Sequence, residues 1–253
     1  SVTVGGQRYA QSRTPLTEVG VLLDAKAVHT GRSARAHLRA MAATHGIPNS
    51  RVDEVIALTG LESVARRRAG KFSLGMGQRL GIAAALLGDP GTLILDEPVN
   101  GLDPEGVRWV REFVRRLARE GRTVLLSSHL MSEMAQTADH VIVLGRGRVL
   151  ADAPLGELVA AWTANEVVVR TPQPAELAAS LQASGPSAGG PVAVESVADG
   201  TLRVTGLPAA AIGDLAAARG IALHELTPRT GSLEEAYMAL TEGSVQYQSK
   251  EIA

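Results

Sequence analysis

The chain has 253 residues, of which 45% are hydrophobic and 20% charged, a composition typical of a folded globular protein. Its formal net charge of −1 gives no electrostatic basis for general nucleic-acid binding, so no nucleic-acid partner is expected. The lack of cysteine excludes disulfides and thiolate metal sites and favours a reducing compartment, while no signal peptide or apolar run of membrane-spanning length is visible.

The first half of the chain alternates helices with short apolar strands. After a strand and turn at residues 1–6, a second short strand is expected at 18–23, and strands of the buried type are expected at 92–95 and 123–127. Helices are expected at 34–45, 51–58, 77–87, about 107–117 and 131–138, followed by a hairpin at 141–150. This alternation predicts an α/β domain with a mostly parallel sheet covered by helices.

The second half has a different pattern, βαββαβ, which is typical of a small ferredoxin-like α+β domain. Its expected strands and helices lie at residues 166–170, 175–181, 192–197, 201–206, 209–219 and 221–226. A last helix begins at Ser232, with Glu235 completing a capping box. We therefore expect a first domain at 1–153, an accessory domain at 154–243 and a mobile tail at 244–253.

Two adjacent carboxylates end the strand in the stretch GTLILDEPVNGLDPEG, residues 91–106. A carboxylate at the carboxyl end of a parallel strand lies where open α/β sheets bind ligands. Asp96 there can hold Mg²⁺, a hard cation that prefers oxygen ligands, and Glu97 can activate a water for attack on a phosphoryl group. Alone this motif is weak, because many strands end in an acidic turn.

The next strand ends in SSH, residues 127–129, at the same predicted sheet edge. His129 can hydrogen-bond a terminal phosphate, although a lone histidine is more often structural. Between the two strands, the turn Asn100–Asp103 directs the Asp103 carboxylate away from the strand end, where it can contact a partner.

Upstream, FSLGMGQRLGIAAALL places Ser73 and glycines just before a long helix. Free backbone N–H groups at a helix N-terminus form an anion site, whereas the simpler interpretation is that Ser73 only caps the helix.

Taken together, these stretches resemble the nucleotide-binding subunit of an ATP-binding cassette (ABC) transporter. FSLGMGQR resembles the family's signature motif, LILDE its Walker B motif, PVNGLD its D-loop, and SSH carries its switch histidine. The match spans roughly residues 1–150, and the ending SLEEAYMALT is similar to bacterial drug- and antibiotic-export ATPases. The resemblance implies a P-loop NTPase fold with a helical subdomain at about 30–88.

The resemblance also implies cofactors, partners and residue roles. ATP and Mg²⁺ are the expected ligands: Ser73, Gly75 and Met76 would contact ATP held by a second, head-to-tail ATP-binding subunit. Asp103 and Asp24 are also expected to be nucleotide-binding residues. Asp96 would serve Mg²⁺, Glu97 the attacking water and His129 the terminal phosphate. A transmembrane permease subunit would place the protein at the cytoplasmic face of the membrane.

The sequence departs from the family pattern at three single positions and in one missing loop. Leu74 replaces the usual first signature glycine, Met76 the usual glutamine, and Asp24 falls at the Q-loop glutamine, where it could still touch Mg²⁺ or the water. No G-x-x-x-x-G-K-[ST] loop occurs in the chain, so the phosphate-binding Walker A region is expected to precede Ser1 in an N-terminally incomplete sequence.

Two alternatives remain at this stage. One is a catalytically incompetent, regulatory partner of a complete ABC ATPase, which an intact upstream Walker A would exclude. The other is a cassette ATPase acting in translation or DNA repair, which usually has two cassettes or a long coiled-coil insertion. Whether the chain itself hydrolyses ATP stays open, because the phosphate loop is lacking.

Overall fold

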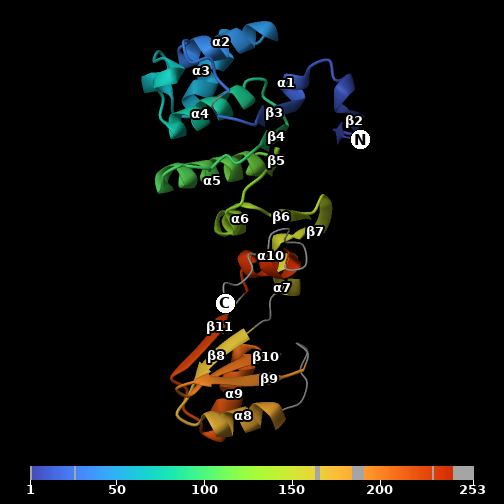
Figure 1. Cartoon of the computed structure of the whole chain (residues 1–253), viewed down its shortest axis with the longest axis vertical. Coiled ribbons are helices and arrows are strands. Elements are labelled where there is room, and N and C mark those ends of the chain that lie inside the picture. Colours follow the sequence, from blue (N-terminus) through green and yellow to red (C-terminus); the bar gives the residue numbers. More distant parts are fainter. Residues whose placement is uncertain (1, 26, 163–165, 184–190, 230, 242–253) are drawn as a thin grey trace, which may run out of the picture. The chain divides into compact units, whose positions relative to one another are not determined.

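The computed structural model of the chain describes residues 2–25, 27–162, 166–183, 191–229 and 231–241 (Figure 1). The chain divides into two compact units, Ser1–Thr137 and Ala138–Ala253. Within the described ranges, no helix combines the length and the apolar character that crossing a bilayer requires.

The first unit is built on a parallel sheet with the strand order β3-β4-β5. Its strands are β3 (Val19–Leu22), β4 (Thr92–Leu95) and β5 (Thr123–Leu126), preceded by the short antiparallel pair β1 (Thr3–Val4) and β2 (Gln7–Arg8). Leu22, Leu95 and Leu126 are paired side by side, so the three strands end at one edge of the sheet. The predicted parallel sheet is confirmed.

Three helices of this unit, α2, α4 and α5, begin after a residue whose side chain caps them. Ser33, Ser73 and Asp103 each accept a hydrogen bond from the backbone N–H three residues on. Because Ser73 sets its first turn, α4 begins three residues before the expected Gly77. The helices are α1 (Pro15–Glu18), α2 (Ala34–Thr44), α3 (Asn49–Leu58), α4 (Leu74–Ala85), α5 (Pro104–Arg119) and α6 (Met131–Thr137), with 3₁₀ turns at Tyr9–Gln11, Glu62–Val64 and Ala69–Lys71.

The core of the first unit lies on one face of the sheet. Gly20 in β3 permits the close packing of α4, because a Cβ at Gly20 would lie 2.0 Å from the Ala85 carbonyl oxygen. The buried core is drawn from the sheet and the helices, and includes Leu22, Leu93, Leu95, Leu38, Ile56, Leu80 and Phe113.

The other face of the sheet has an apolar row that remains accessible. Val21, Ile94 and Leu125 are paired side by side across the three strands. Val21 is 40% exposed and Leu125 is 54% exposed. The expectation of strands buried on both faces therefore holds for one face only.

The second unit contains an antiparallel sheet in the order β11-β8-β10-β9, which confirms the βαββαβ pattern. Helices α8 and α9 supply the other half of its core, on one face of the sheet (Figure 1). The elements are β6 (His140–Gly145), β7 (Arg148–Pro154), α7 (Leu155–Trp162), β8 (Glu166–Arg170), α8 (Pro174–Ala183), β9 (Ala193–Ala198), β10 (Thr201–Thr205), α9 (Ala209–Arg219), β11 (Glu225–Arg229) and α10 (Leu233–Thr241).

The last strand of this sheet lies further along the chain than the expected 221–226. Gly220 has a positive φ of 67°, and the Ile221 N–H donates to the Ala216 carbonyl, which is the closing bond of a helix C-cap. Ile221 is buried as the apolar residue of this cap, so the strand begins only at Glu225. The apolar run 221–226 was thus wrong as a strand prediction.

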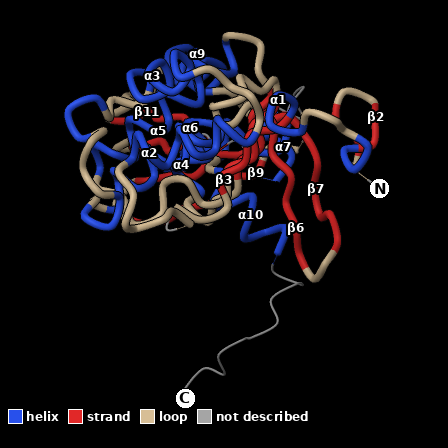
Figure 2. The backbone as a smooth tube through the Cα atoms, turned by 90° about the horizontal axis from the view of Figure 1, so that it is seen from above, coloured by secondary structure: helices blue, strands red, loops and turns tan. Residues whose placement is uncertain are grey.

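The hairpin β6–β7, seen as two long antiparallel strands in Figure 2, belongs to the second unit. The contacts of α7 are with β7, β6 and α10. The predicted domain boundary at 153/154 stays a prediction. The tail expected at 244–253 lies outside the described residues.

Candidate functional site

Three polar stretches meet at the carboxyl edge of the parallel sheet. The Asp96 N–H donates to the Leu22 carbonyl at 2.8 Å, and the Ser127 N–H donates to the Leu95 carbonyl at 3.0 Å. These bonds extend the ladder one residue beyond the strands. The structure therefore brings Asp96 and Ser127 onto adjacent strand ends, as the sequence predicts.

Ser127 links the two carboxylate residues. Its Oγ donates to Asp96 Oδ1 in a short hydrogen bond and accepts from the Glu97 N–H at 2.9 Å. Sequence reasoning did not single out Ser127, whose only sequence signal is its place at the end of an apolar strand. One hydroxyl thus orients both the Asp96 side chain and the Glu97 backbone.

Glu97 has a left-handed backbone, with φ +45°. A non-glycine residue in this region costs of the order of 1–3 kcal/mol and persists where its surroundings hold it. The strained turn re-aims the Glu97 side chain toward β5, where both carboxylate oxygens lie 3.0 Å from His129 Nδ1. The predicted catalytic pair is therefore brought into contact.

The start of α4 contacts the turn after β4. Ser73 Oγ accepts from the Met76 N–H at 3.3 Å, and so acts as the helix cap. Leu74 is 41% exposed, and a Cβ at Gly101 would lie 2.7 Å from its Cδ2. A Cβ at Gly75 would lie 3.7 Å from Leu102 Cδ2, so the signature-like stretch packs on the D-loop-like turn.

Asp103 and Asp24 occupy different settings. Asp103 Oδ1 accepts from the Gly106 N–H at 2.9 Å and caps α5, which is a structural role. Asp24 follows β3 at the same sheet edge as Asp96, and its carbonyl accepts from the Ala27 N–H. Nucleotide contacts of both residues stay predictions.

The donor set at this edge fits an Mg²⁺ that arrives with a substrate. In the part of the chain that the structure describes, no group of three or more His, Asp or Glu residues is arranged to hold a metal. Mg²⁺ usually takes one or two carboxylates and completes its octahedron with phosphates and waters. The exposed carboxylate of Asp96 fits this pattern, whereas it does not form a protein-only cage.

The arginines of α5 have protein partners rather than forming an anion patch. Arg111 pairs with Glu133 on α6 at 3.2 Å, and Arg115 donates to the Gln136 carbonyl at 2.9 Å. These contacts join α5 to α6.

Two family models match parts of the chain. Residues 47–135 match a family described as "AAA domain, putative AbiEii toxin, Type IV TA system", and this range includes Asp96, Glu97 and His129. Residues 165–234 match a domain of unknown function, DUF8746, which coincides with the antiparallel sheet and its helices.

Two curated relatives each match more than half of the chain. The bacitracin transport ATP-binding protein BcrA of Bacillus licheniformis is 38% identical over 160 residues, which are 62% of this chain and 52% of that protein. The lantibiotic transport ATP-binding protein SrtF of Streptococcus pyogenes is 35% identical over 141 residues, 56% of this chain and 62% of that protein. The chain spans about half the length of the BcrA relatives it matches.

A solved structure matches a similar share of the chain. It is cbiO1 from Clostridium perfringens, described as part of the ABC transporter complex cbiONQ, with a TM-score of 0.54 and 26% identity. The alignment covers 62% of this chain and 66% of that one.

Proposed function

We propose that this chain, a relative of the ATP-binding subunits of ABC transporters, is part of a subunit that binds and hydrolyses ATP to power export of a drug-like or antibiotic compound. One observation carries the proposal: the Glu97 carboxylate contacts His129 beside Asp96, at the strand ends. The AAA-domain match and the curated relatives support it.

In the proposed reaction a water attacks the terminal phosphorus of ATP and the bond to the ADP oxygen breaks. Glu97 accepts the proton of the water, and His129 orients the Glu97 carboxylate and contacts the terminal phosphate. Mg²⁺, when bound, neutralises phosphate charge, and Asp96 would hold it. The Ser127 hydroxyl holds the Asp96 side chain and the Glu97 backbone in a fixed arrangement.

The start of α4 is proposed to serve a second nucleotide, held by a second ATP-binding subunit in a head-to-tail pair. Backbone N–H groups near Ser73, Gly75 and Met76 form the positive end of a helix, which favours a phosphate. Asp103, on the turn that contacts α4, is proposed to belong to this second nucleotide site, whereas Asp24 is proposed to lie on the Asp96 side, where it could touch Mg²⁺ or the attacking water. Leu74 limits this approach, because its side chain lies where the related motif has glycine.

A separate transmembrane permease is the proposed membrane partner. The solved relative cbiO1 is described as part of a multi-subunit transporter complex, which supports such a partner here. The subunit would then sit at the cytoplasmic face of the membrane through the permease.

The second candidate is a catalytically incompetent partner of a complete ABC ATPase. It is favoured by one observation, the lack of a G-x-x-x-x-G-K-[ST] loop in this sequence. Such a loop supplies the backbone N–H groups and the lysine that hold the phosphates, and without it Asp96 and Glu97 repel the nucleotide.

The two candidates are separated by ATP hydrolysis of the protein isolated from its source cells, whose intact mass is measured first. An ATPase subunit has a mass above 26.3 kDa and carries an N-terminal glycine-rich lysine loop. Its Glu97→Gln variant loses at least about 100-fold in hydrolysis rate, the usual contribution of a general base.

Glu112→Gln is the matched control, because Glu112 is an exposed helical residue paired only at 3.6 Å with Arg108. It leaves the rate unchanged. A mass near 26.3 kDa with no hydrolysis supports the incompetent partner instead. An undiminished rate in Glu97→Gln contradicts the proposed role of Glu97.

A further inference from the structure

Gln78 is a buried amide close to the carboxylate site. It lies on α4 with 5% of its surface exposed, and its Nε2 donates to the Glu97 carbonyl at 3.4 Å. Its Oε1 is buried and has no hydrogen-bond partner in the described part of the chain. Burying a polar group in this way costs free energy, so core filling alone does not account for an amide here.

The Glu97 backbone is held from two sides. Its N–H donates to Ser127 Oγ on the β5 side, and its carbonyl accepts from the Asn100 N–H at 3.1 Å as well as from Gln78. Glu97 is strained, with its positive φ, and a strained residue keeps its conformation only where several contacts determine it. Gln78 is the contact that comes from α4.

The neighbouring Arg79 fixes the rotation of α4 about its axis. Its Nη1 donates to the Thr59 carbonyl at 3.0 Å, and its guanidinium lies 3.9 Å from the centroid of the Trp109 ring. An arginine stacked on tryptophan and bonded to a helix end is a firm anchor. Since Gln78 precedes Arg79 on a rigid helix, the anchor keeps the Gln78 amide directed at Glu97.

We propose that Gln78 is a positioning residue that ties the Glu97 backbone to helix α4 and so orients the Glu97 carboxylate. Five residues, about 7.5 Å along the helix, separate Gln78 from Ser73, which caps the start of α4. A displacement of α4 that carries Gln78 with it therefore removes one of the three hydrogen bonds that hold the Glu97 backbone. The consequence for hydrolysis rests on the proposed function, whereas the link between Gln78 and Glu97 does not.

The first test replaces Gln78 by methionine, which conserves volume and removes the amide. Loss of the unpartnered Oε1 offsets loss of the long Nε2 bond, so the thermal midpoint changes little. The readout is NMR of the chain without nucleotide, by the ring signals of His129 and hydrogen exchange at the Glu97 amide. A residue that merely fills the core would move neither.

We expect the His129 ring signals of Gln78→Met to shift toward those of Glu97→Gln, and the Glu97 amide to exchange at least about tenfold faster, a loss of about 1.4 kcal/mol of local protection. Gln136→Met is the control, because its Oε1 pairs with Arg111 at 2.6 Å on α5, and it leaves both readouts unchanged. Ring signals identical to wild type in Gln78→Met, while Glu97→Gln shifts them, overturn the proposal.

A second test measures hydrolysis by the protein from its source cells. Gln78→Met lowers kcat about tenfold or more and changes KM by less than about twofold, because it displaces the base and touches no nucleotide. If wild type hydrolyses no ATP, the proposed function fails, and the NMR result still decides the link. A normal kcat in a variant with shifted His129 signals overturns the catalytic part of the proposal.

Discussion

At the scale of single residues, the Ser127 hydroxyl contacts both the Asp96 carboxylate and the Glu97 backbone N–H. Ser127→Ala leaves the Glu97 N–H and Asp96 Oδ1 without this partner, and we expect a loss of about 0.5–1.5 kcal/mol in the free energy of unfolding. Urea unfolding measures it. Ser128→Ala is the control, since Ser128 Oγ accepts a local hydrogen bond from the Leu130 N–H, two residues on. Equal losses in the two variants contradict the bridging role.

His37 gives the first unit a pH-dependent stability. Burial lowers the pKa of His37, and the charges of Arg32 and His29 lower it further. The folded state thus binds fewer protons than the unfolded state below the ordinary pKa of 6.5. Stability is therefore complete above pH 6.5 and falls as the pH drops from there toward the lowered pKa.

The expected measurement is the free energy of unfolding between pH 7.5 and pH 5.5 for wild type and His37→Gln. As the pH falls, the free energy of unfolding declines less in His37→Gln than in wild type, because one buried neutral imidazole is removed. His45→Gln, at an exposed residue bonded to Thr44, keeps the wild-type decline. Parallel curves for wild type and His37→Gln contradict the assignment.

How far the site could be predicted depends on the range of the contacts. Asp96, Glu97 and His129 follow apolar strands, so their shared edge is readable from the order of the elements. Ser127 and Gln78 act through contacts between residues about 20 to 30 apart, which no local pattern encodes. The positive φ of Glu97 is likewise a product of tertiary contacts.

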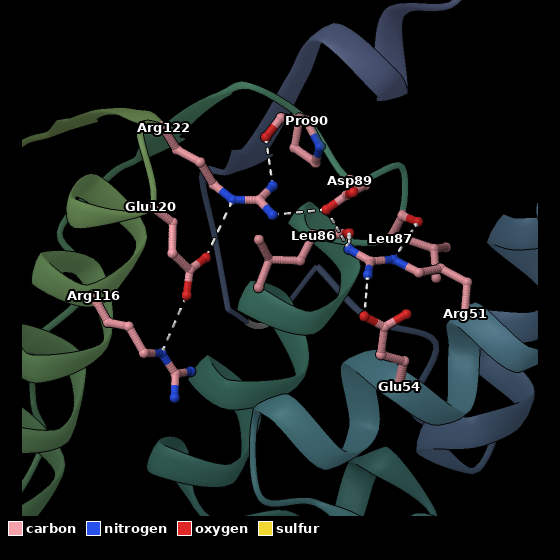
Figure 3. Close-up of polar contacts among 9 residues, drawn as sticks. All are labelled: Arg51, Glu54, Leu86, Leu87, Asp89, Pro90, Arg116, Glu120 and Arg122. Atoms are coloured by element: carbon pink, nitrogen blue, oxygen red, sulfur yellow. Dashed lines mark hydrogen bonds and ion pairs between the residues drawn. The ribbon is translucent and has the colours of Figure 1, made fainter.

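At the scale of elements, a cluster of ion pairs joins α3 to the sheet. Asp89 accepts from Arg122 at 2.8 Å and from Arg51 at 2.9 Å (Figure 3). Arg51 also donates to the Leu86 and Leu87 carbonyls at the end of α4. The hydrogen bond from Arg122 lowers the pKa of Asp89, and the charge of Arg51 adds to this against the effect of burial.

Asp89→Asn tests the cluster without changing the backbone, because asparagine tolerates the left-handed φ of 55°. The loss is modest, about 1 kcal/mol or less at pH 7, since the Asp89 side chain is 60% exposed. The lowered pKa makes this contribution present above pH 3.8 and lost as the pH falls through the folded value. The free energies of unfolding of wild type and variant therefore become equal in acid. Urea unfolding at pH 7 and pH 3 measures the difference between them.

Asp53→Asn is the control, an ion pair between α2 and α3 that does not reach the sheet. It lowers the free energy of unfolding less than Asp89→Asn does. A constant gap between wild type and Asp89→Asn from pH 7 to pH 3 contradicts the charge-based account.

The accessible row Val21–Ile94–Leu125 makes a prediction about association. Parallel sheets are normally covered on both faces, so this apolar row favours contact with other chains. The double variant Val21→Thr, Leu125→Thr lowers self-association in light scattering and changes the free energy of unfolding little. Leu22→Thr, on the buried face, is the control and costs about 2 kcal/mol or more. Unchanged scattering in the double variant contradicts the prediction.

Helices and strands were predicted correctly where one local sequence signal dominates. The prediction failed where the same residues could form either a helix cap or a strand. The apolar strands 92–95 and 123–126 stand between clear turns, and were found almost to the residue. Helix α7 was missed, because Leu155–Trp162 directly follows β7 without a turn between them. The run that begins at Ile221 was wrongly predicted to be a strand, because an apolar residue at this position is compatible with either a helix cap or a strand.

At the scale of the whole molecule, the antiparallel sheet is an insertion between two helices. Helix α10 packs on α7 and β7, so the chain returns to α7 after the sheet. The core of the sheet comes entirely from residues between Val167 and Leu226. The unknown-function family covers the same segment, 165–234, as one block.

An insertion with its own core should fold by itself and be removable. We expect residues 165–230 alone to unfold cooperatively, at modest temperature because a domain of some 60 residues buries little surface. Replacing 163–231 by a short Gly-Ser linker keeps α7 against α10, since their contact does not depend on the sheet. Amide NMR spectra of the two pieces then superpose on that of the full chain.

The matched control deletes only α8, residues 174–183, from the full chain. This removes Leu177 and Leu181, which are fully buried against the sheet, and exposes its apolar face. The signals of the sheet then collapse while those of α7 and α10 persist, because an inserted domain unfolds without taking its host with it. Loss of the α7 and α10 signals in this variant contradicts the insertion and makes the second unit one cooperative fold.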